Sequence, residues 1–210
     1  LQHRVVVEQL AMAGHLQREV LAVSAAVAQL AAQLAGVGFS FTVHGPEEFD
    51  MPAAISLARK VAASRFVVAI SSYGRSQIYR WIPRDQWPRV KVVHCGLDNQ
   101  FHAGLPAVEA AAPPVDFVCV GRICEQKGQL LLVEALALLK QRGQVASLVL
   151  AGDGDMRQVV EQRARELGVE DQLRITGWIG SPQVREAILS AGAMVLPSFG
   201  EGLPVVIMEA

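Results

Sequence analysis

The sequence has few of the residues that build disulfide frameworks, zinc sites or cationic surfaces. Its three cysteines, Cys95, Cys119 and Cys124, are odd in number and show no CxxC spacing. This argues against a disulfide framework and against a zinc site, and it favours a reducing compartment. Cys95 and Cys119 lie in apolar runs, and we expect both to be small core residues. The formal net charge is only -1, so we expect neither nucleic acids nor anionic membranes as general partners. An anionic small ligand needs only a few local charges and is not excluded.

We expect neither a membrane span nor a signal peptide in this sequence. Residues 20–39 are apolar, but Ser24, Gln29 and Gln33 interrupt them and alanine supplies much of the rest, which predicts a helix packed on a sheet. The chain begins with Leu1 and ends at Ala210 inside an apolar helical run, so we expect a fragment cut at both ends. With 51% apolar and 19% charged residues, it should fold as a globular protein.

Short apolar runs alternate with helical segments along the chain, which predicts parallel sheets covered by helices on both faces. We expect helices at residues 2–34, 52–63, 73–81, 126–142, 156–167, 182–190 and from 203 onward, and strands at residues 39–43, 65–70, 90–95, 116–120, 147–151, 173–176 and 194–196. Residues 99–114 break this rhythm with alanine and proline and are interpreted as a linker. The predicted domains are therefore residues 1–105 and 115–210, joined by a linker at 106–114.

Two cations mark the first loop of the second domain. In open parallel sheets, ligands bind beyond the carboxyl ends of the strands, where glycines such as Gly121 and Gly152 let backbone N–H groups approach them. Arg122 and Lys127 lie before or at a helix start, where the helix dipole disfavours positive charge. A diphosphate bound between the two side chains would make their positive charge favourable at this position. Two solvated surface cations are an equally acceptable interpretation.

Two acids form a second pattern in the run EGLPVVIMEA. Pro204 suits the first turn of a helix, which places Glu201 just before the helix and Glu209 two turns along nearly the same face. Eight helical residues span about 12 Å, close to the reach from a sugar to the ribose of one nucleotide. The residues between the acids are apolar, so we expect a buried helix. The alternative is that Glu201 caps the helix and Glu209 meets a buried arginine.

The Asp153-Gly154-Asp155 turn resembles the metal-binding Asp-x-Asp of metal-dependent, single-domain glycosyltransferases, but helix capping explains it more simply. Asp155 and Gln158 have the spacing of a capping box, with Asp155 in the cap position. We therefore expect no metal site there. The turn lacks the third glycine of a dinucleotide-binding fingerprint.

His44 follows a strand of the first domain, at the ligand-facing end of the sheet. An imidazole there can exchange hydrogen bonds with a sugar hydroxyl near neutral pH, although an ordinary turn histidine fits equally well. Glu47 and Glu48 follow in the same loop and are expected to be solvated.

The segments VGRICEQKG, LAGDGDM, TGWIG and PSFGEGLPVVIMEA resemble, in order and spacing, the donor-binding domain of the retaining glycosyltransferases of group one, or family four. The resemblance covers residues 117–210, and its most specific element is the pair of glutamates with seven residues between them, preceded by GRxxxxKG. The first domain matches more loosely through FTVHGPEEFD, VVAISSYGRSQI and VVHCGLD. These loops look most similar to those of bacterial exopolysaccharide enzymes of the colanic-acid type.

The resemblance implies an α/β chain of the GT-B fold, with two doubly wound Rossmann-like domains, both incomplete. It implies that Arg122 and Lys127 bind the donor diphosphate, Glu209 the ribose, and Glu201 with the backbone of Gly202 and Leu203 the donor sugar. Trp178 and Ile179 would line the base, and His44 would stand at the reaction centre. Such enzymes use no metal or other cofactor.

The implied activity is a retaining transfer from a nucleotide-diphosphate sugar to a saccharide or lipid-linked saccharide hydroxyl, in the cytoplasm, with peripheral inner-membrane association open for the full-length protein. Glu201 and Glu209 are too far apart for the paired carboxylates of a retaining glycosidase. Two alternatives stay open, namely a nucleotide-sugar epimerase on the same fold and a catalytically dead sugar-nucleotide-binding module.

Overall fold

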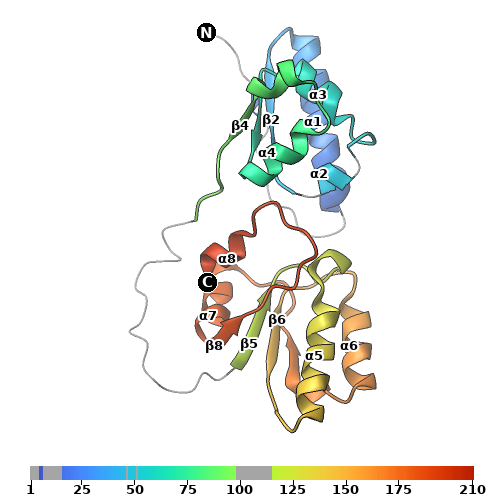
Figure 1. The fold of residues 1–210 in the computed structure, drawn as a ribbon, viewed down its shortest axis with the longest axis vertical. Helices are drawn as coiled ribbons and strands as arrows, with labels where there is room; N and C mark the ends of the chain where they lie inside the picture. The colour runs from blue at the N-terminus through green and yellow to red at the C-terminus, as the bar shows by residue number, and fades with distance from the viewer. Residues whose placement is uncertain (1–4, 7–15, 46, 51, 98–114) are drawn as a thin grey trace. The chain divides into compact units, whose positions relative to one another are not determined.

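The computed structural model describes residues 5–6, 16–45, 47–50, 52–97 and 115–210 of the chain (Figure 1). The chain divides into two compact units. Unit 1 comprises Leu1–Gly96 with Glu201–Leu203, and unit 2 comprises Leu97–Gly200 with Pro204–Ala210. The predicted linker at 106–114 lies outside the described residues, so the domain limits stay a prediction.

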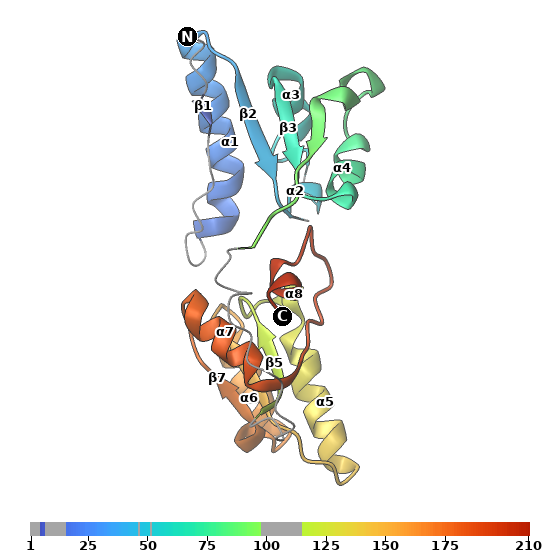
Figure 2. The ribbon, with the colours of Figure 1, turned by 90° about the vertical axis from the view of Figure 1, so that its left-hand side faces the viewer.

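Unit 1 is a four-stranded parallel sheet with helices. Its elements are β1 (Val5–Val6), α1 (Leu16–Ala35), β2 (Phe39–Val43), α2 (Glu47–Asp50), α3 (Leu57–Ala63), β3 (Phe66–Ala69), α4 (Ser72–Tyr79), the 3-10 helix η1 (Arg84–Arg89) and β4 (Val90–Val92). The strands lie in the order β1-β2-β3-β4, and all neighbours are parallel. Figure 2 shows the arrowheads of β2 and β3 at the same end of the sheet.

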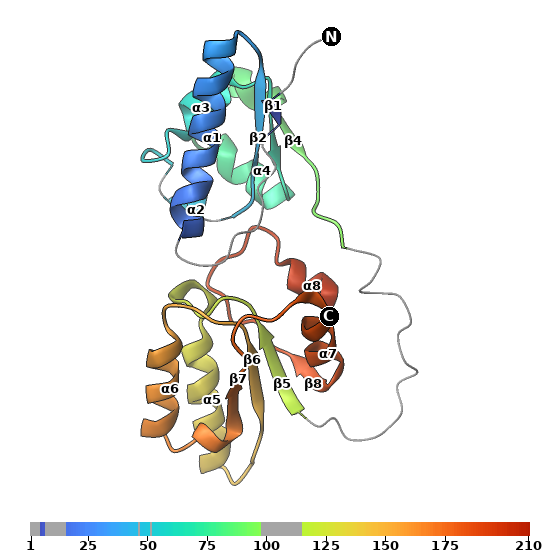
Figure 3. The ribbon, with the colours of Figure 1, turned by 180° about the vertical axis from the view of Figure 1, so that it is seen from behind.

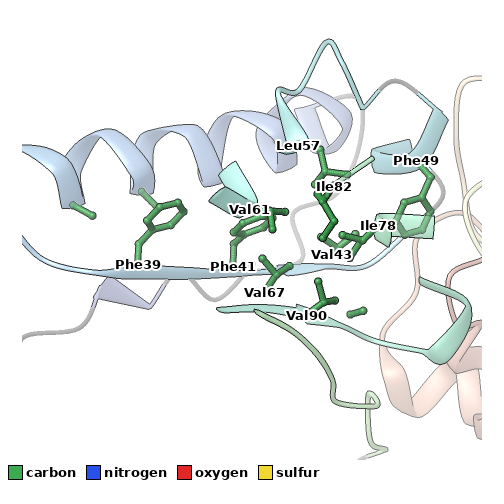
Figure 4. Close-up of a cluster of buried hydrophobic side chains, with 13 residues drawn as sticks. Phe39, Phe41, Val43, Phe49, Leu57, Val61, Val67, Ile78, Ile82 and Val90 are labelled. Carbon is green, nitrogen blue, oxygen red and sulfur yellow. The ribbon is translucent and has the colours of Figure 1, made fainter. Parts of the chain in front are cut away.

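One face of this sheet carries the core of unit 1. Alternate residues of β2, namely Phe39, Phe41 and Val43, are buried with Leu57 and Val61 of α3 (Figure 4). The described helices pack on this face because strands in sequential order, joined by crossovers of one hand, place their helices on the same side. The expected cover on both faces is therefore not found for the described part of unit 1.

Unit 2 contains four strands and their helices. They are β5 (Val115–Val120), η2 (Glu125–Lys127), α5 (Gln129–Gln141), β6 (Leu148–Ala151), α6 (Arg157–Glu166), η3 (Glu170–Gln172), β7 (Leu173–Ile175), α7 (Ser181–Leu189), β8 (Ala191–Met194) and α8 (Val205–Glu209). The order is β7-β6-β5-β8, again all parallel.

The strand order of unit 2 reverses at β5, so its helices cover both faces of the sheet. Figure 3 shows α5 and α6 on one side and α7 and α8 on the other. The core is split accordingly. One cluster joins Val133 and Leu136 of α5 to Leu148 and Leu150, and the other lies around Val118 and Val149. This reversal defines double winding, and it is present in unit 2 as expected.

Several expectations for the elements were wrong. Val5 and Val6 pair as a strand with Phe39 and Ser40 of β2, although a helix was expected there, because two adjacent β-branched residues suit a strand. Strand β8 begins at Ala191 and not at residue 194, since β5 supplies its hydrogen-bonding edge despite the weak strand propensity of its alanines and glycine. Residues 47–50 form the short helix α2 instead of a loop.

Alanine-rich α1 is the helix expected from the apolar stretch near the N-terminus. Among the described residues, no helix has both the length and the hydropathy that a membrane crossing requires.

Candidate functional site

In the described part of unit 2, the reversal of strand order separates two loops that follow neighbouring strands. Strand β5 lies between β6 and β8, and its following helix packs on the opposite face from the helix before β8. A crevice beyond the carboxyl ends of two such strands is where open parallel sheets bind ligands. The loops concerned are residues 121–128 after β5 and residues 195–200 after β8.

Hydrogen bonds tie these two loops together. The backbone N–H of Phe199 donates to the Gln126 carbonyl oxygen at 2.9 Å, and the Gln126 side-chain amide donates to the Gly200 carbonyl oxygen at 2.7 Å. Gly128 has φ +67°, and a Cβ there would lie 2.6 Å from the Pro197 carbonyl oxygen. Glycine is therefore required both by the backbone conformation and by the approach of the second loop.

The loop after β6 joins the same framework. The Ile123 N–H donates to the Asp153 carbonyl oxygen at 2.8 Å, and the Met156 N–H donates back to the Ile123 carbonyl oxygen at 3.2 Å. A Cβ on Gly152 would lie 2.1 Å from the Gly121 carbonyl oxygen. Gly121 and Gly152, both predicted from the sequence, are thus packed backbone to backbone.

Arg122 and Lys127 both lie in the loop after β5, and both are half-buried. The Lys127 side chain passes over Gly121, whose added Cβ would lie 3.8 Å from its Cε. Burial raises the pKa of the Cys119 thiol to about 11, and the charge of Lys127 opposes that rise, which places the ammonium near the end of β5. The predicted helix over 126–142 is divided in two at Gly128, so Lys127 ends η2 and α5 begins after it.

Gln129 is a part of this site that the sequence analysis missed. Its side chain is only 2% exposed, its amide nitrogen donates to the Arg122 carbonyl oxygen at 2.8 Å, and its amide oxygen accepts from the Cys124 N–H at 3.4 Å. One buried amide therefore holds the backbone on both sides of Ile123. The only signal in the sequence was a polar residue at the start of an otherwise apolar helix.

The remaining predicted residues of unit 2 lie over the opposite face of β5. Ile179, in the loop after β7, and Val206, in α8, both pack against the cluster that contains Val118 and Val120 of β5. The Trp178 side chain is 54% exposed. This packing brings the predicted base-lining loop and the helix of Glu209 to one face. Partial burial raises the pKa of the Glu209 carboxyl above its ordinary value.

The helix expected to end near Glu209 is present, but its expected burial was wrong. Helix α8 begins at Val205, after Pro204 at the N-cap, so Glu201 lies just before the helix, as predicted. None of the residues of α8 is buried, and Ile207 is 54% exposed, because the contact that α8 makes with the sheet cluster involves Val206.

Residues 201–203 belong to unit 1, where they lie close to His44. The Ser71 hydroxyl donates to the Gly202 carbonyl oxygen at 2.8 Å, and a Cβ on Gly202 would lie 2.0 Å from the His44 carbonyl oxygen. The His44 ring contacts solvent, yet partial desolvation still lowers its pKa below 6.5. Unit 1 therefore brings together four predicted residues, which are His44, Glu201, Gly202 and Leu203.

Two predictions about acids were wrong. Met156, and not Asp155, occupies the N-cap of α6. Instead, Asp153 orders this turn, because its carboxylate accepts from the Gly154 N–H at 2.8 Å and from Arg157 at 2.9 Å. Glu48 was expected to be solvated, but its carboxylate accepts from the Gly45 N–H at 3.0 Å, directly after His44.

A metal site was not expected for this chain. In the parts of the chain that the structure describes, no group of three or more histidine, cysteine or acidic side chains is arranged to hold a metal ion.

Comparison with protein families gives a match to glycosyl transferases group 1 over residues 104–210. Among curated proteins, the chain is 38% identical over 90 residues to alpha-D-kanosaminyltransferase of Streptomyces kanamyceticus, covering 43% of this chain and 23% of that protein. It is 28% identical over 128 residues to the putative colanic acid biosynthesis glycosyltransferase WcaL of Escherichia coli K12, covering 58% and 31%.

A third relative is matched over a longer segment. The chain is 29% identical over 177 residues to a GDP-mannose-dependent alpha-(1-6)-phosphatidylinositol monomannoside mannosyltransferase of Mycobacterium tuberculosis, covering 76% of this chain and 45% of that protein. The chain thus spans less than half the length of each of these three relatives.

Solved structures show the same fold. Sucrose-phosphate synthase from Thermosynechococcus elongatus superposes with a TM-score of 0.72 at 20% identity, over 90% of this chain and 51% of that one. The apo form of the lipopolysaccharide outer core galactosyltransferase WaaB gives a TM-score of 0.61 at 25% identity, over 90% and 51%.

Proposed function

Because the chain belongs to the glycosyl transferases of group 1 and has their GT-B type of α/β fold, we propose that its protein transfers a sugar from a nucleotide-diphosphate donor to a hydroxyl acceptor. The observation that carries the proposal is the position of two cations in unit 2. There, two tied loops place Arg122 and Lys127 beyond the carboxyl end of β5, at the reversal of strand order.

In this proposal, the two cations hold the donor diphosphate. Arginine grips phosphate oxygens with two parallel N–H groups and lysine adds a point charge, so a dianionic group stabilises both side chains in one loop. Gly121 and Gly152 allow the ligand to approach the backbone. Ile179 and Trp178 line the base, and Glu209 on the same face of β5 accepts hydrogen bonds from the ribose hydroxyls.

The donor sugar and the reaction centre are proposed to involve the residues grouped in unit 1. Glu201, with the backbone of Gly202 and Leu203, holds the sugar hydroxyls, and His44 lies beside them. Because desolvation lowers the pKa of His44, its ring is neutral at pH 7 and can both donate and accept a hydrogen bond.

The proposed chemistry is a front-face transfer that retains the anomeric configuration without a metal. The bond between the anomeric carbon and the diphosphate oxygen breaks, and its electron pair passes to that oxygen. The acceptor hydroxyl then bonds to the anomeric carbon on the same face and gives its proton to the leaving phosphate. Arg122 and Lys127 stabilise the charge that develops on the phosphate, which is the main demand of the transition state.

We further propose that the acceptor is a saccharide or a lipid-linked saccharide in polysaccharide assembly. This rests on the relatives, because WcaL is named for colanic acid biosynthesis and the mycobacterial enzyme for a phosphatidylinositol mannoside acceptor. A cytoplasmic location fits the three free cysteines.

The test is the turnover of a panel of nucleotide sugars by the full-length protein and its variants. Arg122→Ala and Lys127→Ala should each lower kcat/KM by about 100-fold or more, because each removes a charge that faces the leaving group. Arg142→Ala, at the exposed far end of α5, is the matched control and should keep wild-type turnover. Wild-type rates for both loop variants would contradict the proposed diphosphate site.

Product analysis separates the alternatives. A transferase consumes donor only as acceptor is glycosylated, whereas an epimerase converts the donor sugar without any acceptor. A binding module would bind donor tightly and release no nucleotide diphosphate in either assay.

A further inference from the structure

The loop between β7 and α7, residues 176–180, is held by hydrogen bonds at both of its ends. The Thr176 N–H donates to a backbone carbonyl oxygen of β6 at 3.0 Å, and the Gly180 N–H donates to a side-chain oxygen in the first turn of α7 at 2.8 Å. Between these two points lie Trp178 and Ile179, the residues that we propose to line the base. The contacts that fix the middle of this loop therefore decide where a base can bind.

An ion pair beside the loop after β6 lies against Gly177. The Arg157 Nη1 donates to Asp153 Oδ2 at 2.9 Å, and the Arg157 Nε donates to Glu161 Oε1, also at 2.9 Å. Gly177 has φ +74°, and a Cβ there would lie 3.6 Å from Asp153 Oδ2 and 3.8 Å from Arg157 Nη1. The pair thus occupies the side of Gly177 from which any other amino acid would project its side chain.

Asp153 also contacts the loop that carries the two cations. Its backbone carbonyl oxygen accepts from the Ile123 N–H at 2.8 Å, one residue after Arg122. Its other carboxylate oxygen accepts from the Gly154 N–H at 2.8 Å, which fixes the carboxylate relative to its own backbone. One residue therefore joins the proposed diphosphate loop on one side to the proposed base loop on the other.

A contribution to folding does not account for this arrangement. The Arg157 and Asp153 side chains are 37% and 27% exposed, and partly exposed pairs with i,i+4 spacing contribute little to stability. Arg163 forms ion pairs of the same kind further along α6, with Glu134 of α5 and with Glu166. What distinguishes the Arg157 pair is its place between two loops at the carboxyl edge of the sheet.

We propose that Asp153 and Arg157 form a clamp that fixes the base loop relative to the two cations, so that the site selects a nucleoside diphosphate over a bare diphosphate. The inference rests on the proposed function and adds two positioning residues to it, which act through the loop. A loop that is already held in its binding conformation loses less conformational entropy when the base binds. The clamp therefore increases affinity for the base without a contact of its own to the donor.

The experiment compares the affinities of the full-length protein for inorganic diphosphate, UDP and GDP by calorimetry. The wild type should bind at least one of the two nucleotides more tightly than inorganic diphosphate. The double variant Arg157→Ala, Glu161→Ala keeps the net charge, and it should weaken that nucleotide by about 10-fold while inorganic diphosphate stays within about twofold. In turnover, KM for the donor should rise with little change in kcat, because the base makes the same contacts in the ground state and the transition state.

The matched control removes the same two residue types from the same helix. Arg163→Ala with Glu166→Ala should bind every probe as the wild type does, and circular dichroism checks that both double variants are folded. Wild-type nucleotide affinity without Arg157 and Glu161, equal weakening of inorganic diphosphate, or equal effects of the two double variants would overturn the clamp and leave the diphosphate site standing. A wild-type protein that binds none of the three probes would overturn the diphosphate site and the clamp together.

Discussion

At the scale of single residues, the candidate site depends on groups that support the backbone as much as on groups that face a ligand. Arg122 and Lys127 were visible in the sequence because cations at a helix start conflict with its dipole. Gln129 was not visible, because a glutamine on a helix is usually a solvated surface residue, and only the structure shows its side chain buried between two backbone groups.

Replacing Gln129 tests this supporting role. Gln129→Ala leaves the Arg122 carbonyl and the Cys124 N–H without their present partner, so the free energy of unfolding of unit 2 should fall by about 1–3 kcal/mol. Urea unfolding followed by circular dichroism measures it. Gln144→Ala, an exposed position after α5, should change it by less than about 0.5 kcal/mol. Equal stability of the two variants would contradict the assignment.

Cys119 offers a test of burial at the end of β5. Because burial raises the pKa of its thiol to about 11, the folded protein should resist alkylation at pH 8, whereas half-buried Cys95 should react first. The raised pKa also means that the unfolded state ionises first as the pH rises through 9, so stability should fall between about pH 9 and 11. Mass spectrometry of the labelled peptides gives the order of reaction, and faster labelling of Cys119 would be inconsistent with the structure.

At the scale of elements, most strands and helices could be predicted from the sequence, because short apolar runs such as residues 39–43 and 147–151 leave little choice of structure. The errors arise where long-range partners decide. Strand β8 has a weak local signal and forms because β5 pairs with it. The extent of α8 and its burial depend on packing that a run of apolar residues does not specify.

The contact between the loops after β5 and β8 can be tested with two glycines of the same conformation. Gly128 and Gly143 have φ +67° and +73°, but only at Gly128 would an added Cβ clash, 2.6 Å from the Pro197 carbonyl oxygen. Both alanine variants should lose about 1–2 kcal/mol from the left-handed backbone. Gly128→Ala should lose more, and thermal unfolding measures the difference. Equal losses would indicate that the loops do not approach each other so closely.

At the scale of the whole molecule, the chain contains two units with separate cores. The cluster of Leu57 and Val61 in unit 1 shares no residue with the clusters of unit 2. The α/β class and the parallel sheets were predicted from the alternation of apolar runs. The single covered face in the described part of unit 1 was not, because the order of strands in space has no local signature in a sequence.

Two core substitutions test the independence of the units. Leu57→Ala and Leu136→Ala each remove a side chain that is at most 2% exposed, and each should cost about 2–5 kcal/mol. We expect each to lower only the unfolding transition of its own unit. Hydrogen exchange resolved by peptide distinguishes the units, and loss of protection in both from either substitution would show that they unfold together.

The hydrogen bonds that join the loops after β5, β6 and β8 run mainly from one backbone to another, as in the pairs Ile123–Asp153 and Phe199–Gln126. Such bonds are largely indifferent to which side chains the loops carry. Exposed positions in these loops, like Phe199, are therefore free to vary in identity while the scaffold keeps its geometry. Ligand preference at these loops should therefore change through substitution of side chains. Insertions or deletions within the loops should instead abolish ligand binding.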